Sequence, residues 1–271
     1  MKTCIQNKCF ENSTAIMAIL NVTPDSFSDG GKYTNIDAVL KRTDEMILQG
    51  ADIIDIGGES TKPNYTQISC DEEIERVCPV VEQIKSRFDI PISVDTYKYN
   101  VAKTALECGA DMINDIWGFK KSPNIAKLVK EHNAACCLMH NRENCDYSDF
   151  YDNVLSDLKE SVKIAKSAGI VDEKIIIDGG VGFAKTQEQN LEILKCTKRL
   201  SKDIGLPVMV AASRKSVIGY VLDCDVSNRL EGTLAITAHA LMNGARFVRV
   251  HDIAENRRVI DMINAITNGG V

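Results

Sequence analysis

Eight short runs of apolar, mostly β-branched residues recur along the chain, and longer amphipathic stretches separate them. The short runs span residues 16–20, 53–56, 92–94, 112–113, 135–139, 175–177, 208–211 and 247–250. Continuous apolar runs of this kind are typical of parallel strands that are buried on both faces. Between them, apolar residues lie three or four positions apart, as at Ile36, Val39 and Leu40, which predicts helices with one buried face.

Eight strand–helix units in a chain of 271 residues predict a single (β/α)8 barrel, the TIM-barrel fold. The alternative is an open doubly wound sheet, which usually has fewer strands and a glycine-rich phosphate-binding turn after its first strand. The corresponding turn here is Asn21-Val22-Thr23-Pro24-Asp25, so the barrel is favoured. We expect residues 1–14 to be an N-terminal extension and residues 15–271 to form one catalytic domain.

Helix-capping residues mark three of the expected helix starts. Segments 69–72 and 186–189 have the Ser/Thr-x-x-Glu/Gln spacing of a capping box. Ser122 followed by Pro123 fits an N-cap and a first helical position. We therefore expect helices to begin directly after residues 69, 122 and 186.

Charge and cysteine content limit the expected partners and location. The net charge is −6 and no run of Lys and Arg is clustered, whereas nucleic-acid binding needs a concentrated basic surface. A small anion remains a possible ligand. No apolar stretch is long enough to span a bilayer, and residues 1–14 contain too few apolar residues for a signal peptide. The ten cysteines include no CxxC pair, and Cys136 and Cys137 lie in a strand-like run, so we expect reduced core thiols and a cytoplasmic location.

Polar residues close nearly every predicted strand. The active site of a (β/α)8 barrel lies at the carboxyl ends of its strands, so these residues are candidates for function. They are Asn21, Asp55, Asp95, Asn114, His140, Asp178, the Ser213-Arg214-Lys215 group, Arg249 and His251. Any one of them could simply mark where a strand meets water. As a set, they place carboxylates, amides and cations at one end of the barrel, which indicates a binding site.

The first group in this set consists of Asp95, Asn114 and Asp178. No Ser or Cys with a histidine base stands at matching positions, so nucleophilic catalysis is not indicated. A carboxylate accepts paired N–H donors and an amide both donates and accepts, so the three suit the polar edge of a planar heterocycle. Taken singly, each could instead cap a helix or pair with Lys98 or Lys185.

The second group is cationic and consists of Lys215, Arg249 and His251. Its positive charge would bind an anion and stabilise the negative charge of a leaving group. The alternative is a solvated charge pair, for which Asp252 and Glu231 are available. The turn at residues 179–183 would let backbone approach a ligand, and Phe183 could stack on a ring.

Two longer segments resemble the signatures of the dihydropteroate synthases, a family of pterin-binding enzymes. They are residues 19–31, ILNVTPDSFSDGG, and residues 55–63, DIGGESTKP. Shorter matches follow in the same order at 93–96, 113–115, 138–140, around Asp178, and at 213–216, 231–233 and 249–252. The resemblance extends from about Met17 to the C-terminus, and its two long motifs are far more specific than any short one.

The resemblance implies a transferase that condenses (7,8-dihydropterin-6-yl)methyl diphosphate with p-aminobenzoate, giving 7,8-dihydropteroate and diphosphate in folate biosynthesis. It also implies Mg²⁺ as cofactor and a cytoplasmic homodimer that sulfonamides target. By position, the pterin site would consist of Asp95, Asn114, Ile116, Met139, Asp178, Phe183, Lys215 and Arg249. The p-aminobenzoate site would be Phe27, Thr61, Lys62 and Ser213, and the diphosphate site Asn21, Thr61, Arg249 and His251, with Asn21 at the metal. Asp95, Lys215 and Arg249 would be the catalytic residues.

Three positions depart from the family pattern. Lys62 stands where the family more often has arginine, Gly179 replaces the usual proline, and Val217 replaces a larger apolar residue. Lysine keeps the charge but loses the planar fork, and Gly179 should leave the loop after Asp178 less pre-ordered.

Two alternative functions stay open. One is a methyltetrahydrofolate-binding methyltransferase domain, although segments 23–28 and 213–215 favour the synthase. The other is a catalytically silent pterin-binding paralogue, and Lys62 is the feature that keeps this alternative open.

Overall fold

Parallel strands form a closed barrel in the computed structural model, which describes residues 2–11, 13–22, 36–59 and 67–268. Around the barrel, each strand is hydrogen-bonded to the next in the order β10 (Phe247–Val250), β3 (Ala15–Asn21), β4 (Ile53–Gly57), β5 (Ile92–Asp95), β6 (Met112–Asp115), β7 (Ala135–Met139), β8 (Ile175–Asp178) and β9 (Val208–Val210). Every predicted strand is present, although β9 ends one residue before the predicted Ala211. The predicted (β/α)8 barrel is confirmed.

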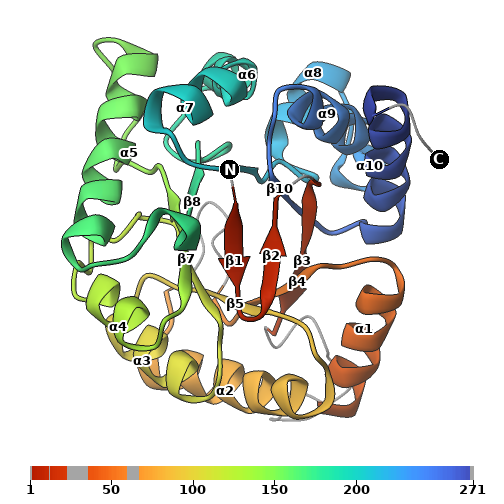
Figure 1. Cartoon of the computed structure of the whole chain (residues 1–271). Helices are drawn as coiled ribbons and strands as arrows, with labels where there is room; N and C mark the ends of the chain where they lie inside the picture. Colours follow the sequence, from red (N-terminus) through yellow and green to blue (C-terminus); the bar gives the residue numbers. More distant parts are fainter. Residues whose placement is uncertain (1, 12, 23–35, 60–66, 269–271) are drawn as a thin grey trace.

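Helices surround the barrel (Figure 1). They are α1 (Ile36–Leu48), α2 (Cys70–Arg87), α3 (Tyr99–Glu107), α4 (Ile125–Glu131), α5 (Phe150–Ser167), α6 (Gln187–Lys195), α7 (Thr197–Ile204), α8 (Ser216–Leu222), α9 (Leu230–Met242) and α10 (Ile253–Asn268), with short 3₁₀ turns at η2 (Asp172–Lys174) and η3 (Val226–Asn228). Ser69 caps α2, and Thr186 forms a complete capping box at α6. The start predicted after Ser122 is wrong by two residues, because the Ser122 carbonyl accepts the N–H of Ile125 in a turn and α4 begins there.

Alternate residues of each strand point into the barrel or out toward the helices. The inward residues near the amino ends are apolar and include Ile53, Met112, Ile176 and Phe247. Their outward neighbours, such as Ile54 and Ile113, belong to the larger core between the strands and helices. Two positions further along the same strands stand Asp55, Asn114, Asp178 and Arg249, which therefore also point inward. The strand period thus gathers polar side chains at the carboxyl end, above an apolar layer.

A two-stranded hairpin covers the other end of the barrel. Its strands β1 (Thr3–Ile5) and β2 (Lys8–Phe10) pair antiparallel and lie across the middle of the ring of helices in Figure 1. Ile5 is fully buried, and the Phe10 ring packs edge-on against Phe247 with centroids 5.5 Å apart. Because Phe247 begins β10, the hairpin closes the amino end of the barrel. The division into an extension at 1–14 and a catalytic domain at 15–271 stays a prediction.

A disulfide joins Cys4 and Cys9 across this hairpin. The prediction that the cysteines are reduced thiols is therefore wrong for these two. The pair is brought together by the hairpin register, which places the two residues directly opposite each other with Cα atoms 4.2 Å apart. Eight other cysteines are free thiols, and Cys136 and Cys137 are buried in β7 as expected.

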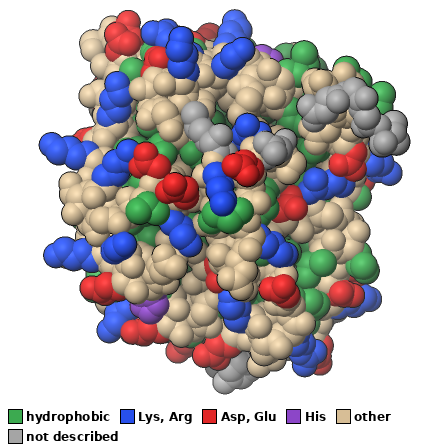
Figure 2. All heavy atoms as spheres, viewed as in Figure 1, with side chains coloured by type: hydrophobic (Ala, Val, Ile, Leu, Met, Phe, Trp, Pro, Cys, Tyr) green, Lys and Arg blue, Asp and Glu red, His purple; other side chains and the backbone are tan. Residues whose placement is uncertain are grey.

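Charged side chains of both signs are interspersed over the face of the molecule that Figure 2 shows. Several large apolar side chains are nevertheless exposed on helices, including Leu48, Met242, Met262 and Ile266, which are between 62% and 80% exposed. Within the described residues, no helix combines the length and apolar character needed to cross a membrane.

Candidate active site

Arg249 binds two carboxylates at the barrel mouth. Its Nε donates to Asp55 Oδ2 at 2.6 Å, and its Nη2 donates to Asp95 Oδ2 at 2.8 Å. Asn114 Nδ2 lies 3.4 Å from the same Asp55 oxygen. The second oxygens of Asp55 and Asp95 are buried and have no hydrogen-bond partner among the described residues. The ends of β4, β5, β6 and β10 thus combine a cation, an amide and two carboxylates, and leave two acceptor atoms for a ligand.

Burial perturbs the charges of this group. It raises the pKa of Asp95 to about 7; Arg249 opposes the shift, and Asp55 and Glu73 reinforce it. For Arg249, burial alone would lower the pKa, but the two carboxylates outweigh it and the pKa is raised. Arg249 therefore stays charged, whereas burial shifts Asp95 toward its protonated form, in which it can also donate a hydrogen bond.

Asp178 and Lys215 form a second charged group at the mouth. Asp178 closes β8, and its Oδ1 accepts the N–H of Gly180 at 2.7 Å. Lys215 Nζ donates to the Val181 carbonyl at 2.6 Å and lies 4.7 Å from the centre of the Phe183 ring. Burial raises the pKa of Asp178 and lowers that of Lys215 to about 8, and in each case the other residue opposes the shift. Each group therefore favours the charged form of the other.

Side chains from neighbouring segments hold the loop at residues 179–184. Asn190 Oδ1 accepts one of its N–H groups at 2.6 Å, and the Tyr147 hydroxyl donates to one of its carbonyls at 2.8 Å. A Cβ atom at Gly179 would lie 2.6 Å from Ile193 Cγ1, so Ile193 fills the space that a larger residue would take. The expectation that Gly179 leaves this loop less pre-ordered stays a prediction; in the structure, packing against Ile193 and these two hydrogen bonds hold the loop.

Ser213 and His251 contact each other after β9 and β10. The backbone N–H of His251 donates to Ser213 Oγ at 3.2 Å, and His251 Nδ1 lies 3.1 Å from the same oxygen. Asp252, considered above as a partner for the cationic group, forms its ion pair with Arg214. Lys215 and Arg249 are therefore directed to the barrel mouth instead of to that carboxylate.

Lys98 and Lys185, considered above as partners for the acidic and amide residues, bind elsewhere. Lys98 Nζ lies 2.8 Å from Glu59 Oε1 and 2.8 Å from Glu73 Oε2. Lys185 Nζ lies 2.8 Å from His140 Nδ1. Neither lysine forms a hydrogen bond or an ion pair with the three residues of the first group in the described part of the chain, so these stay directed at the mouth.

Asn21 closes β3 at the rim of the mouth and is exposed. A Cβ atom at Gly57 would lie 3.4 Å from Asn21 Oδ1, so the amide oxygen lies beside the end of β4. In the described segments, no cluster of three or more His, Cys, Asp or Glu could hold a metal by itself. Mg²⁺ usually takes few protein ligands and keeps waters and substrate phosphates. A single amide oxygen at this rim fits a metal of that kind.

The apolar residues predicted for the pterin site lie beside the polar ones. Met139 is buried and pairs with Asp178 in the β7–β8 ladder, and Ile116 is buried directly after β6. Phe27, Thr61 and Lys62, predicted for the p-aminobenzoate and diphosphate sites, lie outside the described residues.

Asp55 is the site residue to which sequence reasoning assigned no role. It was noted as a polar strand end, and its position two residues after Ile53 would have shown that it points inward. Its partner Arg249, however, lies 194 residues away in sequence. No local pattern indicates that these two residues meet.

Known proteins that resemble the chain identify its family. Residues 17–251 match the family described as pterin binding enzyme. The chain is 54% identical to the dihydropteroate synthase of Clostridium beijerinckii, over 93% of this chain and 94% of the relative. It is 49% identical to the dihydropteroate synthase of Bacillus subtilis, over 96% of this chain and 91% of the relative. The chain belongs to the pterin-binding enzymes, among the dihydropteroate synthases.

Solved structures of dihydropteroate synthases share the fold. One from Clostridium difficile, solved in the presence of pteroic acid, has a TM-score of 0.92 at 46% identity and covers 95% of this chain and 98% of its own. One from Xanthomonas albilineans, with 4-aminobenzoic acid, has a TM-score of 0.91 at 34% identity and covers 98% of this chain and 97% of its own. The family and the transferase class predicted from the two sequence motifs are confirmed.

Proposed function

We propose that the chain joins (7,8-dihydropterin-6-yl)methyl diphosphate to p-aminobenzoate, giving 7,8-dihydropteroate and diphosphate. The observation that carries the proposal is the buried group of Arg249, Asp55 and Asp95, in which two carboxylate oxygens lack partners among the described residues. A buried acceptor without a partner costs about 1–3 kcal/mol, so a heterocycle with N–H donors would be favoured there. The solved relatives with pteroic acid and 4-aminobenzoic acid support the choice of substrates.

The pterin would lie among the inward residues of the mouth. Asp95, Asn114 and Asp178 would bind its polar edge, and Lys215 would donate to a ring acceptor. The burial of Asn114 and Asp178 favours hydrogen bonds that water does not compete for. Ile116, Met139 and Phe183 would line the slot on either side of the ring, and Arg249 would lie over its face.

The reaction breaks the bond between the pterin methylene and a diphosphate oxygen, forms a bond from that carbon to the amine nitrogen, and releases one amine proton. If diphosphate leaves first, the electron-rich pterin delocalises the positive charge on the methylene. A weakly basic arylamine needs no strong general base. Asp95, Lys215 and Arg249 would therefore act as catalytic residues by positioning the pterin and by stabilising charge.

The diphosphate would bind near Arg249 and His251. A guanidinium carries five N–H donors, and the Nε and Nη2 groups of Arg249 already bind carboxylates while its charge remains available. Asn21 would be the protein ligand of Mg²⁺, which when bound would neutralise charge on the diphosphate. Thr61 would complete this site.

The p-aminobenzoate would bind at Ser213, whose hydroxyl contacts His251 between the ends of β9 and β10. Phe27, Thr61 and Lys62 would complete that site. Lys62 can bind a carboxylate by its charge, though without the two-point contact of a guanidinium.

The protein would act in the cytoplasm as a homodimer. Met242, Met262 and Ile266 are exposed on α9 and α10, which pack against each other. Met242 and Ile266 lie at the carboxyl ends of their helices, and in this fold those ends face away from the mouth. Exposed apolar residues on adjacent helices suit a symmetric contact between two copies.

One assay tests the proposed function. Purified protein is incubated with the pterin diphosphate, p-aminobenzoate and Mg²⁺, and diphosphate release is measured with and without the aminobenzoate. Release that depends on the aminobenzoate, and that is lost in Asp95→Ala, is the expected result. Tight pterin binding without release would instead indicate a silent paralogue, and methyl transfer from methyltetrahydrofolate would indicate a methyltransferase.

A further inference from the structure

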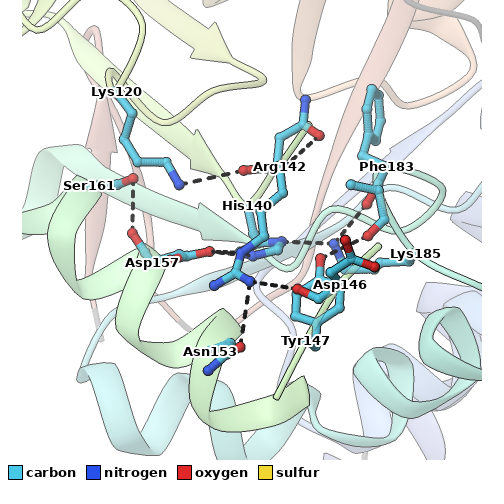
Figure 3. Close-up of polar contacts among 12 residues, drawn as sticks. Lys120, His140, Arg142, Asp146, Tyr147, Asn153, Asp157, Ser161, Phe183 and Lys185 are labelled. Carbon is cyan, nitrogen blue, oxygen red and sulfur yellow. Dashed lines mark hydrogen bonds and ion pairs between the residues drawn. The ribbon is translucent and has the colours of Figure 1, made fainter. Parts of the chain in front are cut away.

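Lys185 carries a buried amino group that none of the roles above uses, and burial lowers its pKa to about 7. It follows the loop after β8, is 9% exposed, and its Nζ donates to His140 Nδ1 at 2.8 Å and to the Phe183 carbonyl at 3.0 Å. Figure 3 shows its amino group between the imidazole and the segment that carries Phe183. Burying a charge is costly unless hydrogen bonds compensate it, so this placement depends on its partners.

Asp157 sets the orientation of the imidazole that Lys185 contacts. His140 Nε2 lies 3.0 Å from Asp157 Oδ2 in α5, and the same oxygen accepts Arg142 Nε at 2.6 Å. Burial lowers the pKa of His140 to about 4, so the imidazole is neutral at pH 7. Its single N–H then donates from Nε2 to the carboxylate, and Nδ1 keeps the lone pair that accepts from Lys185.

The same lysine supports the loop at the proposed pterin slot. A Cβ atom at Gly180 would lie 3.3 Å from Lys185 Nζ, and Gly180 donates its N–H to Asp178. Gly180 and Ala184 have φ angles of 71° and 43°, in the left-handed region that alanine rarely adopts. Backbone of this kind persists only where its surroundings hold it. Without Lys185, the contacts that place Phe183 and Asp178 would be weakened.

We propose that Lys185 is a positioning residue for the pterin substrate and that the neutral imidazole of His140 holds it in place. By tying the Phe183 carbonyl to the end of β7, Lys185 keeps the Phe183 ring beside Lys215. When the Lys185 amino group is protonated, its charge also favours the ionised form of Asp178. This inference rests on the proposed function, and in it Lys185 and His140 act on the wall of the site without touching the reacting atoms.

The first test is Lys185→Met, which removes the charge and both hydrogen bonds while keeping an unbranched side chain. The dissociation constant of the pterin diphosphate should rise about 10- to 100-fold, the range of one charge-assisted hydrogen bond. The KM for the pterin should rise in proportion, whereas kcat and the KM for p-aminobenzoate should change much less. A variant that melts like the wild type and binds the pterin with unchanged affinity would overturn the inference.

A matched pair at His140 separates positioning from general destabilisation. His140→Asn places an amide oxygen near the position of Nδ1, so it keeps an acceptor for Lys185 and loses the contact with Asp157. His140→Gln reaches the position of Nε2, so it keeps the contact with Asp157 and loses the acceptor. The asparagine variant should largely retain its affinity for the pterin. The glutamine variant should lose affinity to the same extent as Lys185→Met. The opposite order would refute the inference. If Lys185→Met does not fold, this pair decides.

A second matched pair tests the loop itself. Tyr147→Phe removes the hydrogen bond to the Ala184 carbonyl, whereas Tyr151→Phe removes a hydrogen bond of similar length to Asp203, away from the loop. Only the first should raise the KM for the pterin; equal effects would contradict the inference. If the wild type binds the pterin but releases no diphosphate, the proposed reaction fails, and the binding constants of these variants still decide the role of Lys185.

Discussion

Replacing Arg249 by methionine tests whether this residue stabilises the protein through its two carboxylates. The substitution keeps an unbranched side chain of similar reach and leaves Asp55 and Asp95 without the cation that they bind at 2.6 and 2.8 Å. Breaking a buried ion pair by removing one partner typically costs about 3–5 kcal/mol. We expect a loss of that size in the free energy of unfolding at pH 7. Diphosphate release should fall by at least about 100-fold, because the stabilising charge is lost.

The pH dependence of this loss follows from Asp95. Its pKa is raised in the folded protein to about 7, so the folded state favours the protonated form. The stability that this carboxyl contributes is fully present below its unfolded pKa of about 4 and is lost as the pH rises through the folded pKa. Arg249 holds that pKa down, so in the variant the loss continues above pH 7. Between pH 6 and 8 the variant should therefore lose more stability than the wild type, and the difference between their free energies of unfolding should widen by on the order of 1 kcal/mol.

Urea unfolding between pH 6 and 8, followed by circular dichroism and by the fluorescence of the single tryptophan, Trp117, measures both quantities. The range ends at pH 8 because burial lowers the pKa of Lys215 to about 8, and this group would add its own titration above that pH. Arg257→Met is the matched control, because its partner Asp52 is about a third exposed and the pair should be worth about 1 kcal/mol or less at every pH. A deficit for Arg249→Met that is equal at pH 6 and pH 8 would refute the reasoning.

Three further predictions concern the rest of the molecule. Alkylation of the urea-unfolded chain without reduction should modify the eight free cysteines, and prior reduction should add Cys4 and Cys9, as mass spectrometry would show. Cys4→Ser should lower the free energy of unfolding by about 2 kcal/mol, since the closed loop is short. Gly179→Ala should lower the free energy of unfolding by about 1–3 kcal/mol, because its Cβ would lie 2.6 Å from Ile193 Cγ1; an unchanged melting temperature would contradict this packing. Ile266→Glu should shift the proposed dimer toward monomer in sedimentation experiments while diphosphate release per chain is retained, and an unchanged sedimentation coefficient would argue against α10 as the interface.

Local sequence patterns predicted the strands well and the N-terminal segment poorly. Most strands are short apolar runs with a polar residue at or near the carboxyl end, as at Asp178, so their positions could be inferred without knowledge of their partners. The hairpin offers no such run. Its burial depends on two anchors, Ile5 and Phe10, which become core residues only because the amino end of the barrel presents Phe247 to them. The Cys4–Cys9 disulfide was missed for the same reason, because it depends on the register of that hairpin.

For the candidate site, too, the sequence predicted some features and missed others. Polar strand ends and the two long motifs indicated a pterin-binding barrel and most of the residues at its mouth. They did not indicate that Arg249 binds both Asp55 and Asp95, which lie 194 and 154 residues away in sequence. They also did not indicate that Lys185 and His140 form a buried contact across 45 residues.

By itself, the sequence determined the barrel, the ends of its strands and the family, because each depends on residues that are adjacent or regularly spaced along the chain. Tertiary structure decided which of the gathered charges form pairs, and which lysine supports the loop after β8. The physical reason is that barrel closure and strand register set distances between residues that are far apart in sequence. At those distances, burial and neighbouring charges then determine the pKa values and the hydrogen-bond partners of the site.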